Sequence, residues 1–242
     1  MATPQYDDIF VKKLFDRMGR TYDLVNLLSS FGFSEFWRWQ CVANLPMAPG
    51  AIVCDMMAGT GECWPYIRRR GGAAITSIDF SRAMVARQKR RRSSKGLRID
   101  VRCENALATS LPSASVDFVV SAFGLKTLDP HALRRFGGEI RRILRPGGHF
   151  SLIEISVPAD WALARLYRWY VNGVIPMIGR LCPGDTECYR MLGVYTEAFG
   201  SCSKIAPVFQ ELGLAVTVKR HFYGCATSLV GRKESGTNHP ES

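Results

Sequence analysis

Short apolar runs alternate with amphipathic stretches from residue 51 onward, and this alternation predicts the secondary structure. Buried strands are predicted at 51–56, 74–79, 98–103, 116–122 and 148–155. Helices are predicted between them at 64–70, 81–93 and 130–143. Because strands and helices alternate, we expect a doubly wound α/β fold with a parallel sheet and right-handed crossovers.

The pattern changes on both sides of this repeat. Residues 1–48 read as a helical cap that precedes the sheet. After the fifth strand, an aromatic-rich helical insertion spans 157–200 and is typical of a lid or a substrate wall. A further helix at 202–212 and closing strands at 214–221 and 224–231 complete one predicted domain, 1–233. The polar tail 234–242 is predicted to be disordered.

The first strand leads directly into a glycine-flanked turn. The apolar run from Ala51 ends near the carboxylate of Asp55, and Gly59 and Gly61 follow. Glycine permits positive φ and a close approach to the backbone, so this loop suits a bound ligand. An ordinary strand-turn-helix with structural glycines is the alternative.

The same stretch restricts the kind of ligand. A dinucleotide fingerprint places a third glycine where this chain has Trp64, and no Gly-Lys-Ser/Thr run is present to hold a phosphate. Asp79 ends the second strand, 18 residues after Gly61, where a ribose-binding carboxylate is expected. This combination fits a nucleoside cofactor without phosphates, and S-adenosylmethionine (SAM) is the commonest such ligand. Asn105 and the pair 123–124 also follow strand ends, so they should reach the same crevice.

Composition and charge narrow the partners. Eight scattered cysteines without a Cys-x-x-Cys pair predict a reduced, cytoplasmic protein with no metal site. The net charge of +11 is concentrated at predicted helix ends, where cations complement the helix dipole. Attraction to an anionic membrane surface or an acidic substrate remains open, as does a homo-oligomer. Nucleic-acid binding is not expected, because no aromatic residues lie among the basic residues at 87–92.

Landmarks along nearly the whole chain resemble the UbiE-type C-methyltransferases of ubiquinone and menaquinone biosynthesis, within the class I SAM-dependent methyltransferases. The landmarks lie at 15–29, 55–61, 79–81, 105–106, 123–125, 144–148, 154–156, 175–179 and 231–233. The resemblance implies a seven-stranded, mostly parallel, Rossmann-like sheet with SAM across its strand ends.

The resemblance also implies roles for individual residues. Gly59 and Gly61, within the motif that includes Ala58, would let the backbone meet the methionine part, and Asp55 would lie near its ammonium. Asp79, followed by Phe80, would take the ribose hydroxyls, and Asn105 would pair with the adenine edge, helped by the backbone of Ala106. Tyr22 would help to close the pocket.

The catalytic residues are harder to predict. Methylation of a ring carbon requires a phenolic or enolic oxygen to lose its proton. Of the four histidines, His221 is the candidate base that remains when those in the tail, at the other end of the sheet and on a helix surface are set aside, and a structural role is the favoured alternative for it. The quinone enzymes usually continue the Phe-Gly-Leu segment with Arg-Asn, whereas this chain has Lys126-Thr127, and Arg and Lys are not interchangeable in an organised site. We therefore expect Lys126 to act on the substrate side.

The leading hypothesis is a SAM-dependent methyltransferase acting on carbon of a hydrophobic small molecule, either quinol-like or a specialised metabolite. A SAM-binding cyclase without net methyl transfer and a non-catalytic SAM-binding subunit are the rivals.

Overall fold

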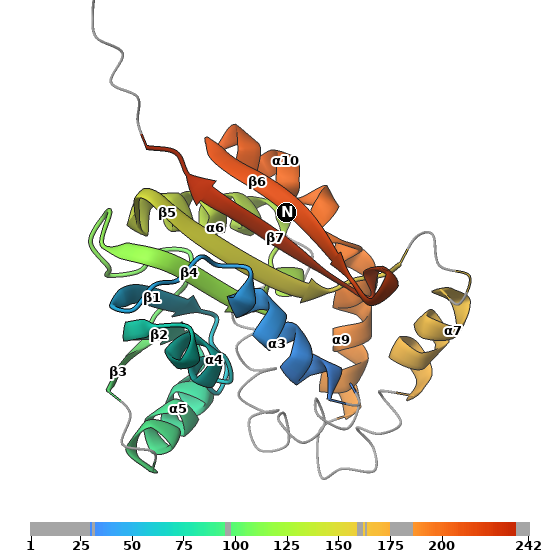
Figure 1. Ribbon diagram of the computed structural model, residues 1–242. Helices are drawn as coiled ribbons and strands as arrows, with labels where there is room; N and C mark the ends of the chain where they lie inside the picture. The colour runs from blue at the N-terminus through green and yellow to red at the C-terminus, as the bar shows by residue number, and fades with distance from the viewer. Residues whose placement is uncertain are drawn as a thin grey trace, which may run out of the picture.

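A seven-stranded sheet forms the centre of the molecule (Figure 1). The computed structural model describes residue 30 and residues 32–94, 98–158, 162, 164–174 and 186–235. The strands are β1 (Ala51–Met56), β2 (Gly72–Asp79), β3 (Ile99–Cys103), β4 (Val116–Ala122), β5 (Leu144–Ile155), β6 (Leu214–His221) and β7 (Ala226–Lys233). The predicted seven-stranded, mostly parallel sheet is confirmed.

The strand order is β3-β2-β1-β4-β5-β7-β6. β1 to β5 pair in parallel, and only β7 runs antiparallel to its two neighbours. The chain first builds outward from β1 to β3 and then returns to place β4 on the other side of β1. A topological switch point therefore lies between β1 and β4, where open α/β sheets bind ligands outside the carboxyl ends of their strands.

Helices cover both faces of the sheet. On one face lie α3 (Phe33–Ala43) and α4 (Trp64–Arg69), whose Trp37 and Trp64 belong to a core with Val53 and Val120. On the opposite face α6 (Pro130–Ile143) and α10 (Ala206–Glu211) pack against the second core. α5 (Arg82–Ser94) adjoins β2 and β3 at the far end of the sheet (Figure 1).

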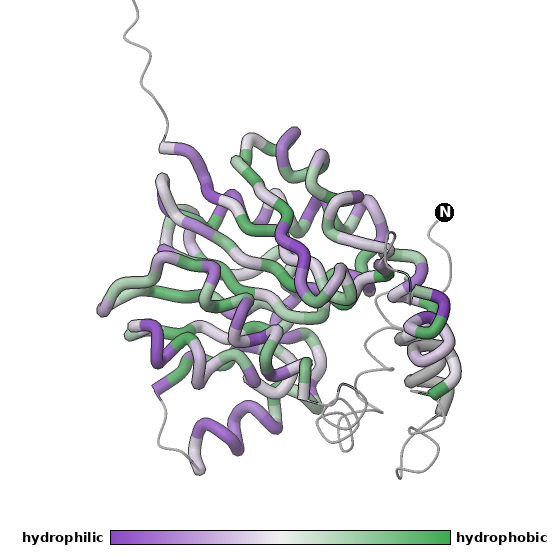
Figure 2. The backbone as a smooth tube through the Cα atoms, turned by 45° about the vertical axis from the view of Figure 1, so that its right-hand side comes forward, coloured by the Kyte–Doolittle hydropathy of each residue, from purple (hydrophilic) through white to green (hydrophobic). Residues whose placement is uncertain are grey.

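Hydropathy follows this layering. The central strands carry mostly hydrophobic residues, whereas α5 at the lower left is largely hydrophilic (Figure 2). The basic residues predicted at helix ends include Arg91 and Arg92 in the last turn of α5. α6 begins as the sequence predicts, because Asp129 caps it by accepting a hydrogen bond from Ala132 N at 2.7 Å.

The boundaries of several elements differ from the predictions. β5 begins at Leu144 instead of 148, since the turn at Gly147 (φ 78°) lies within the strand that pairs with β4. β7 begins two residues later than expected, after the short 3₁₀ turn η5 (Phe222–Gly224). The helix predicted at 202–212 is a 3₁₀ turn, η4 (Cys202–Lys204), followed by the shorter α10.

The insertion after β5 contains helices, as predicted from its pattern. α7 (Ala164–Trp169) continues into a short π-helical segment, η3 (Tyr170–Val174), and α9 (Thr186–Phe199) follows. Residues 175–185 of the predicted insertion and most of the predicted cap and tail lie outside the described residues. Of the cap, α3 is described.

Candidate cofactor and acceptor site

A pocket opens at the switch point, over the carboxyl ends of β1, β2 and β4. Its empty volume is about 580 Å³, including space continuous with solvent. The strand ends and loops that line it contribute Asp55, Met57, Ala58, Gly59, Asp79, Phe80, Ala122, Phe123, Gly124 and Thr127. Arg38, Glu62, Cys63 and Met84 complete the lining. The structure thus brings five of the eight predicted cofactor residues to one pocket.

The backbone bends sharply where β1 and β4 reach this pocket. Met57 (φ 54°) and Phe123 (φ 66°) both have positive φ, which is uncommon for non-glycine residues and tends to occur at functional sites. Gly124 lies so close to the side chain of Met57 that a Cβ at this position would be 2.8 Å from the thioether sulfur. These bends turn an apolar wall of Met57 and Phe123 toward the pocket.

Asp55 is a buried carboxylate without a local partner. It is 1% exposed, and its Oδ2 has no hydrogen-bond partner among the described residues. Burial raises the pKa of Asp55 well above its usual range, and the nearby Glu62 and Asp79 raise it further. A buried acceptor of this kind suits a cationic ligand group, which would supply both a donor and a compensating charge.

Asp79 performs a different task at the end of β2. Its Oδ2 accepts from Gly59 N and its Oδ1 accepts from Ser81 N, both at 2.9 Å. The carboxylate thus holds the glycine loop against the start of α5 while it lines the pocket. A carboxylate oxygen can accept more than one hydrogen bond, so Asp79 can also receive donors from a ligand.

The glycine loop is held from behind by a buried relay. Trp64 Nε1 donates to Ser77 Oγ (3.2 Å), which is 3.0 Å from Gln88 Oε1, and Gln88 Nε2 donates to Gly59 O (2.8 Å). A Cβ at Gly61 (φ 82°) would lie 2.4 Å from the Trp64 ring. Gly61 therefore serves the packing of Trp64 and does not line the pocket, and the indole fills the space where a dinucleotide-binding loop has its third glycine.

Arg38 and Glu62 belong to the site, although sequence reasoning missed both. Arg38, only 4% exposed, donates to Glu62 Oε1 (3.1 Å) and to Glu35 Oε1 (2.7 Å), and its guanidinium carbon lies 5.1 Å from the Phe123 ring centroid. Glu62 also accepts from Thr60 N at 3.0 Å. This bridge ties α3 to the glycine loop. A charged residue within the otherwise aromatic Trp37–Trp39 segment was the available signal.

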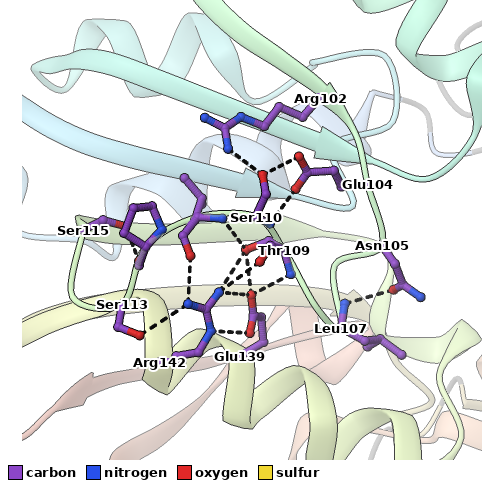
Figure 3. A network of polar contacts seen from close by, with 12 residues as sticks. Arg102, Glu104, Asn105, Leu107, Thr109, Ser110, Ser113, Ser115, Glu139 and Arg142 are labelled. Carbon is purple, nitrogen blue, oxygen red and sulfur yellow. Dashed lines mark hydrogen bonds and ion pairs between the residues drawn. The ribbon is translucent and has the colours of Figure 1, made fainter.

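Asn105 and Ala106 lie on the loop after β3, beyond the pocket lining. Asn105 is exposed, and its Oδ1 accepts from Leu107 N at 2.9 Å. Figure 3 shows how this loop is fastened: Glu104 binds Ser110, while Glu139 of α6 accepts from Thr109 and Arg142. The contact of Asn105 and Ala106 with adenine stays a prediction.

The pKa of Glu139 reflects these contacts. Burial opposes ionisation of this carboxyl, but the hydrogen bonds from Arg142 and Thr109 together outweigh burial, and the pKa is lowered.

Lys126 does not line the pocket. It is 4% exposed, and its Nζ lies 2.7 Å from Glu154 Oε1 and donates to Phe123 O at 3.2 Å. Glu154, fully buried, accepts from the backbone N–H of Lys126 (3.2 Å) through its other oxygen. The expectation that the Lys126 ammonium meets the acceptor does not agree with this position, since the charge is already committed to Glu154.

His221 is also remote from the pocket. It ends β6, four strand positions from β1, which corresponds to roughly 19 Å at the usual strand spacing. Its Nε2 lies 2.8 Å from Ser228 Oγ, and burial, with the charge of Lys219, lowers its pKa. This position does not suit the predicted base. Tyr22 lies outside the described residues.

The pocket's polar groups fit SAM. The orphaned oxygen of Asp55 suits an ammonium, Asp79 retains acceptor capacity for ribose hydroxyls, and Phe80 and Met84 offer an apolar surface. Burial raises the pKa of Cys63, so this residue lines the pocket as a neutral thiol. No phosphate-binding loop is present in the sequence. The fold and site define a class I SAM-dependent methyltransferase.

The chain belongs to the ubiE/COQ5 methyltransferase family, whose sequence model matches residues 3–233. It is 31% identical over 220 residues to a demethylmenaquinone methyltransferase of Thermus thermophilus, covering 90% of this chain and 99% of the relative. It is 30% identical over 188 residues to a ubiquinone/menaquinone biosynthesis C-methyltransferase UbiE of Hydrogenovibrio crunogenus, covering 75% of this chain and 72% of the relative. The predicted family, enzyme class and cofactor are confirmed.

Solved structures agree on the fold. A SAM-dependent methyltransferase, possible histamine N-methyltransferase, from Thermotoga maritima matches with TM-score 0.61 and 17% identity over 92% of this chain and 99% of that one. The [4+2]-cyclase SpnF matches with TM-score 0.57 and 17% identity over 84% and 81%. At these identities the likeness concerns architecture and does not separate methyl transfer from cyclisation.

Two further observations concern the described residues alone. None of the helices in the described part of the chain has the length and apolar content of a membrane span. Within the same ranges, no group of three or more His, Cys, Asp or Glu side chains is arranged to hold a metal ion.

Proposed function

We propose that the enzyme methylates a ring carbon of a hydrophobic, quinol-like aromatic acceptor. The observation that carries the proposal is the apolar wall of Met57, Ala122, Phe123 and Gly124, which lies directly beside the carboxylates of the cofactor side. The relatives named demethylmenaquinone methyltransferase support an acceptor of this class. A specialised aromatic metabolite would fit the same wall.

SAM supplies an activated methyl group on a sulfonium when it is bound. Asp55 would hold its ammonium, and Asp79 would hold its ribose while keeping the glycine loop in place through Gly59. Methyl transfer from SAM to the ring carbon would leave S-adenosylhomocysteine, and the proton displaced from that carbon would pass to solvent water. Catalysis by this chain is therefore mainly positioning and exclusion of water.

Lys126 takes part as a positioning residue. Together with Glu154 it clamps the 123–127 segment, because Glu154 binds both the ammonium and the backbone N–H of Lys126. Phe123, Gly124 and Thr127 of that segment line the pocket. The changed pair Lys126-Thr127 thus shapes the acceptor wall, which is where we expect differences in substrate choice to arise.

The acceptor's own oxygens activate the ring. No histidine or lysine lines the pocket formed by the described residues, and Asp79, Glu62 and Arg38 already share their charges with neighbours. A hydroquinone provides electron-donating oxygens on its ring, whereas the oxidised quinone is electron-poor. We therefore expect only the reduced acceptor to react.

The test combines the purified protein, SAM and a soluble short-chain demethylated hydroquinone. One S-adenosylhomocysteine per methylated product supports the proposal, and the oxidised quinone serves as the matched negative control. Product formation that needs SAM without consuming it would instead support the cyclase. Turnover confined to non-quinol aromatics would move the acceptor to the specialised metabolites.

A further inference from the structure

The exposed large apolar side chains are gathered in one region of the protein. The six in the described part of the chain lie on only three elements, α3, α7 and η5: Phe36, Trp39, Leu166, Trp169, Phe222 and Tyr223. Five of the six are aromatic. Scattered apolar residues on a surface need no explanation, but a concentration of this kind marks an interaction site.

Contacts join the three elements into one surface. The Phe33 ring of α3 lies 4.8 Å from the Phe222 ring of η5. Tyr167 of α7 donates through its hydroxyl to Cys225 O, just after η5, at 3.2 Å. On α3 itself, Phe36 and Trp39 stack with their ring centroids 5.4 Å apart. We call the exposed faces of α3, α7 and η5 the aromatic surface.

Basic residues accompany the aromatic ones. Arg165 and Arg168 are exposed on α7 beside Leu166 and Trp169, and Lys219 and Arg220 are exposed where β6 leads into η5. α7 contains no buried residue. A helix that presents Trp and Leu together with Arg is typical of segments that lie in a lipid headgroup region.

Acidic groups nearby do not cancel this charge. Glu35 of α3 is bound to Arg38 and Tyr66, and Glu197 of α9 lies 3.8 Å from Arg168. Among the described residues, these two carboxylates accompany four basic residues, and Glu35 is already paired inside the protein, so the described part of the aromatic surface is positive. Anionic lipid is therefore the complementary partner.

The position of the surface fits the reaction. η5 joins β6 to β7 at the same carboxyl edge of the sheet that carries the pocket, and α7 follows the carboxyl end of β5 (Figure 1). α3 contributes Phe36 and Trp39 to the surface and Arg38 to the pocket. We propose that the aromatic surface docks the enzyme on an anionic lipid bilayer, so that a lipophilic acceptor enters the pocket from the membrane. The acceptor part of this statement rests on the proposed function, whereas the docking does not.

The test is co-sedimentation of the full chain with lipid vesicles in the absence of any acceptor. We expect at least tenfold tighter binding to vesicles containing about 30% phosphatidylglycerol than to pure phosphatidylcholine, and weaker binding at high salt. Arg165→Ser/Arg168→Ser should weaken binding to the anionic vesicles by roughly tenfold or more, since each basic residue near the surface contributes substantially. Trp169→Ser should weaken it by several-fold.

The matched control removes two basic residues from the other end of the sheet. Lys89→Ser/Arg90→Ser changes two exposed cations of α5 and should leave vesicle binding within twofold. An equal loss in the α5 and α7 pairs would overturn the proposal, because binding would then follow net charge alone. Equal binding to both vesicle types, or to neither, would also overturn it.

A second outcome is tested in solution. If sedimentation velocity shows a dimer that Trp169→Ser converts to a monomer, another copy of the chain covers the surface and the lipid proposal fails. Unchanged thermal melting and SAM affinity in all variants show that the fold is intact. Turnover of the soluble hydroquinone without vesicles tests the proposed function separately.

Discussion

The two halves of the pocket differ in how they treat charge. The cofactor half, at the ends of β1 and β2, contains the carboxylates of Asp55, Glu62 and Asp79, with Arg38 as the lining cation. The proposed acceptor half, after β4, presents Phe123, Gly124 and Thr127, and the buried carboxylate of Glu154 next to this segment is neutralised by Lys126 at 2.7 Å. The cofactor half therefore has more negative than positive groups, whereas the charges of Lys126 and Glu154 beside the acceptor half cancel.

This difference shows how one sheet edge can serve two chemically unlike ligands. A buried, unpartnered carboxylate such as Asp55 is unfavourable for the free protein and becomes favourable when a cation arrives. A buried ion pair such as Lys126–Glu154 instead fixes the position of the surrounding backbone, because its two charges bind each other and nearby backbone groups and leave no charge for a ligand. Asp55 is therefore suited to binding a cationic ligand, and the Lys126–Glu154 pair is suited to positioning the segment that lines the pocket.

The largest expected effect concerns the acceptor half. Glu154→Leu leaves the Lys126 ammonium buried without its partner and should lower the free energy of unfolding by about 3–5 kcal/mol. The double variant Lys126→Met/Glu154→Leu removes both charges and should recover most of this loss. Urea denaturation of the single and double variants measures the difference.

The double variant also separates positioning from stability. We expect its kcat to fall while its affinity for SAM stays near that of the parent, because the 123–127 segment loses its clamp and the cofactor half does not. A double variant as unstable as Glu154→Leu, or one with unaltered kcat, would contradict the positioning role.

The next effect concerns Asp79. Asp79→Ala should weaken SAM binding by more than tenfold, since it removes ligand acceptors and also releases the Gly59 and Ser81 N–H groups. Asp79→Asn keeps one acceptor oxygen and should lie between the parent and the alanine variant. Calorimetric titration with SAM checks the order, and equal affinities for all three proteins would show that the ribose lies elsewhere.

A smaller effect, of opposite sign, is expected for the stability of Asp55→Asn without SAM. Burial raises the pKa of Asp55 in the folded state, so the unfolded chain ionises first and stability is lost as pH rises from the unfolded pKa through the folded one. Asparagine has no such loss. We expect the variant to melt a few degrees higher at neutral pH, where about 1 kcal/mol corresponds to about 2–4 °C, and to match the parent near pH 4 or below.

The smallest effect concerns the loop that carries Asn105. Its anchor Glu139 has a lowered pKa, so the stability it contributes is complete above the unfolded pKa and is lost as pH falls through the lower folded pKa. Glu139→Gln should cost about 0.5–1 kcal/mol at neutral pH. Amide hydrogen exchange of residues 104–111 should become faster in this variant. Unchanged exchange there would show that Glu139 does not anchor the loop.

The fold was largely predictable from the sequence, because its signals are local. Each strand of the repeat is an apolar run of the expected length, and Asp129-Pro130 marks the start of α6 by capping chemistry alone. The displaced starts of β5 and β7 depend on pairing with a neighbouring strand, which no local pattern encodes.

From the sequence, the meeting of residues at one pocket could be predicted only for those that follow the ends of β1 and β2. Asp55 and Asp79 follow strand ends within one motif, so their convergence follows from topology. Arg38 and Glu62 are 24 residues apart, and Lys126 and Glu154 are 28 apart, so each pair forms only when the chain is folded. The sequence suggests an acceptor role for Lys126 because this residue follows a strand end, but it does not reveal that Glu154 pairs with the Lys126 ammonium.

The central claim is that the Asp55 carboxylate receives the cationic end of SAM. Calorimetric titration of SAM into the parent protein and Asp55→Asn, repeated across pH, tests this most directly. The account predicts that affinity of the parent rises with pH as Asp55 ionises, and that the variant binds at least tenfold more weakly with little pH dependence. Equal affinities with the same pH profile would contradict it.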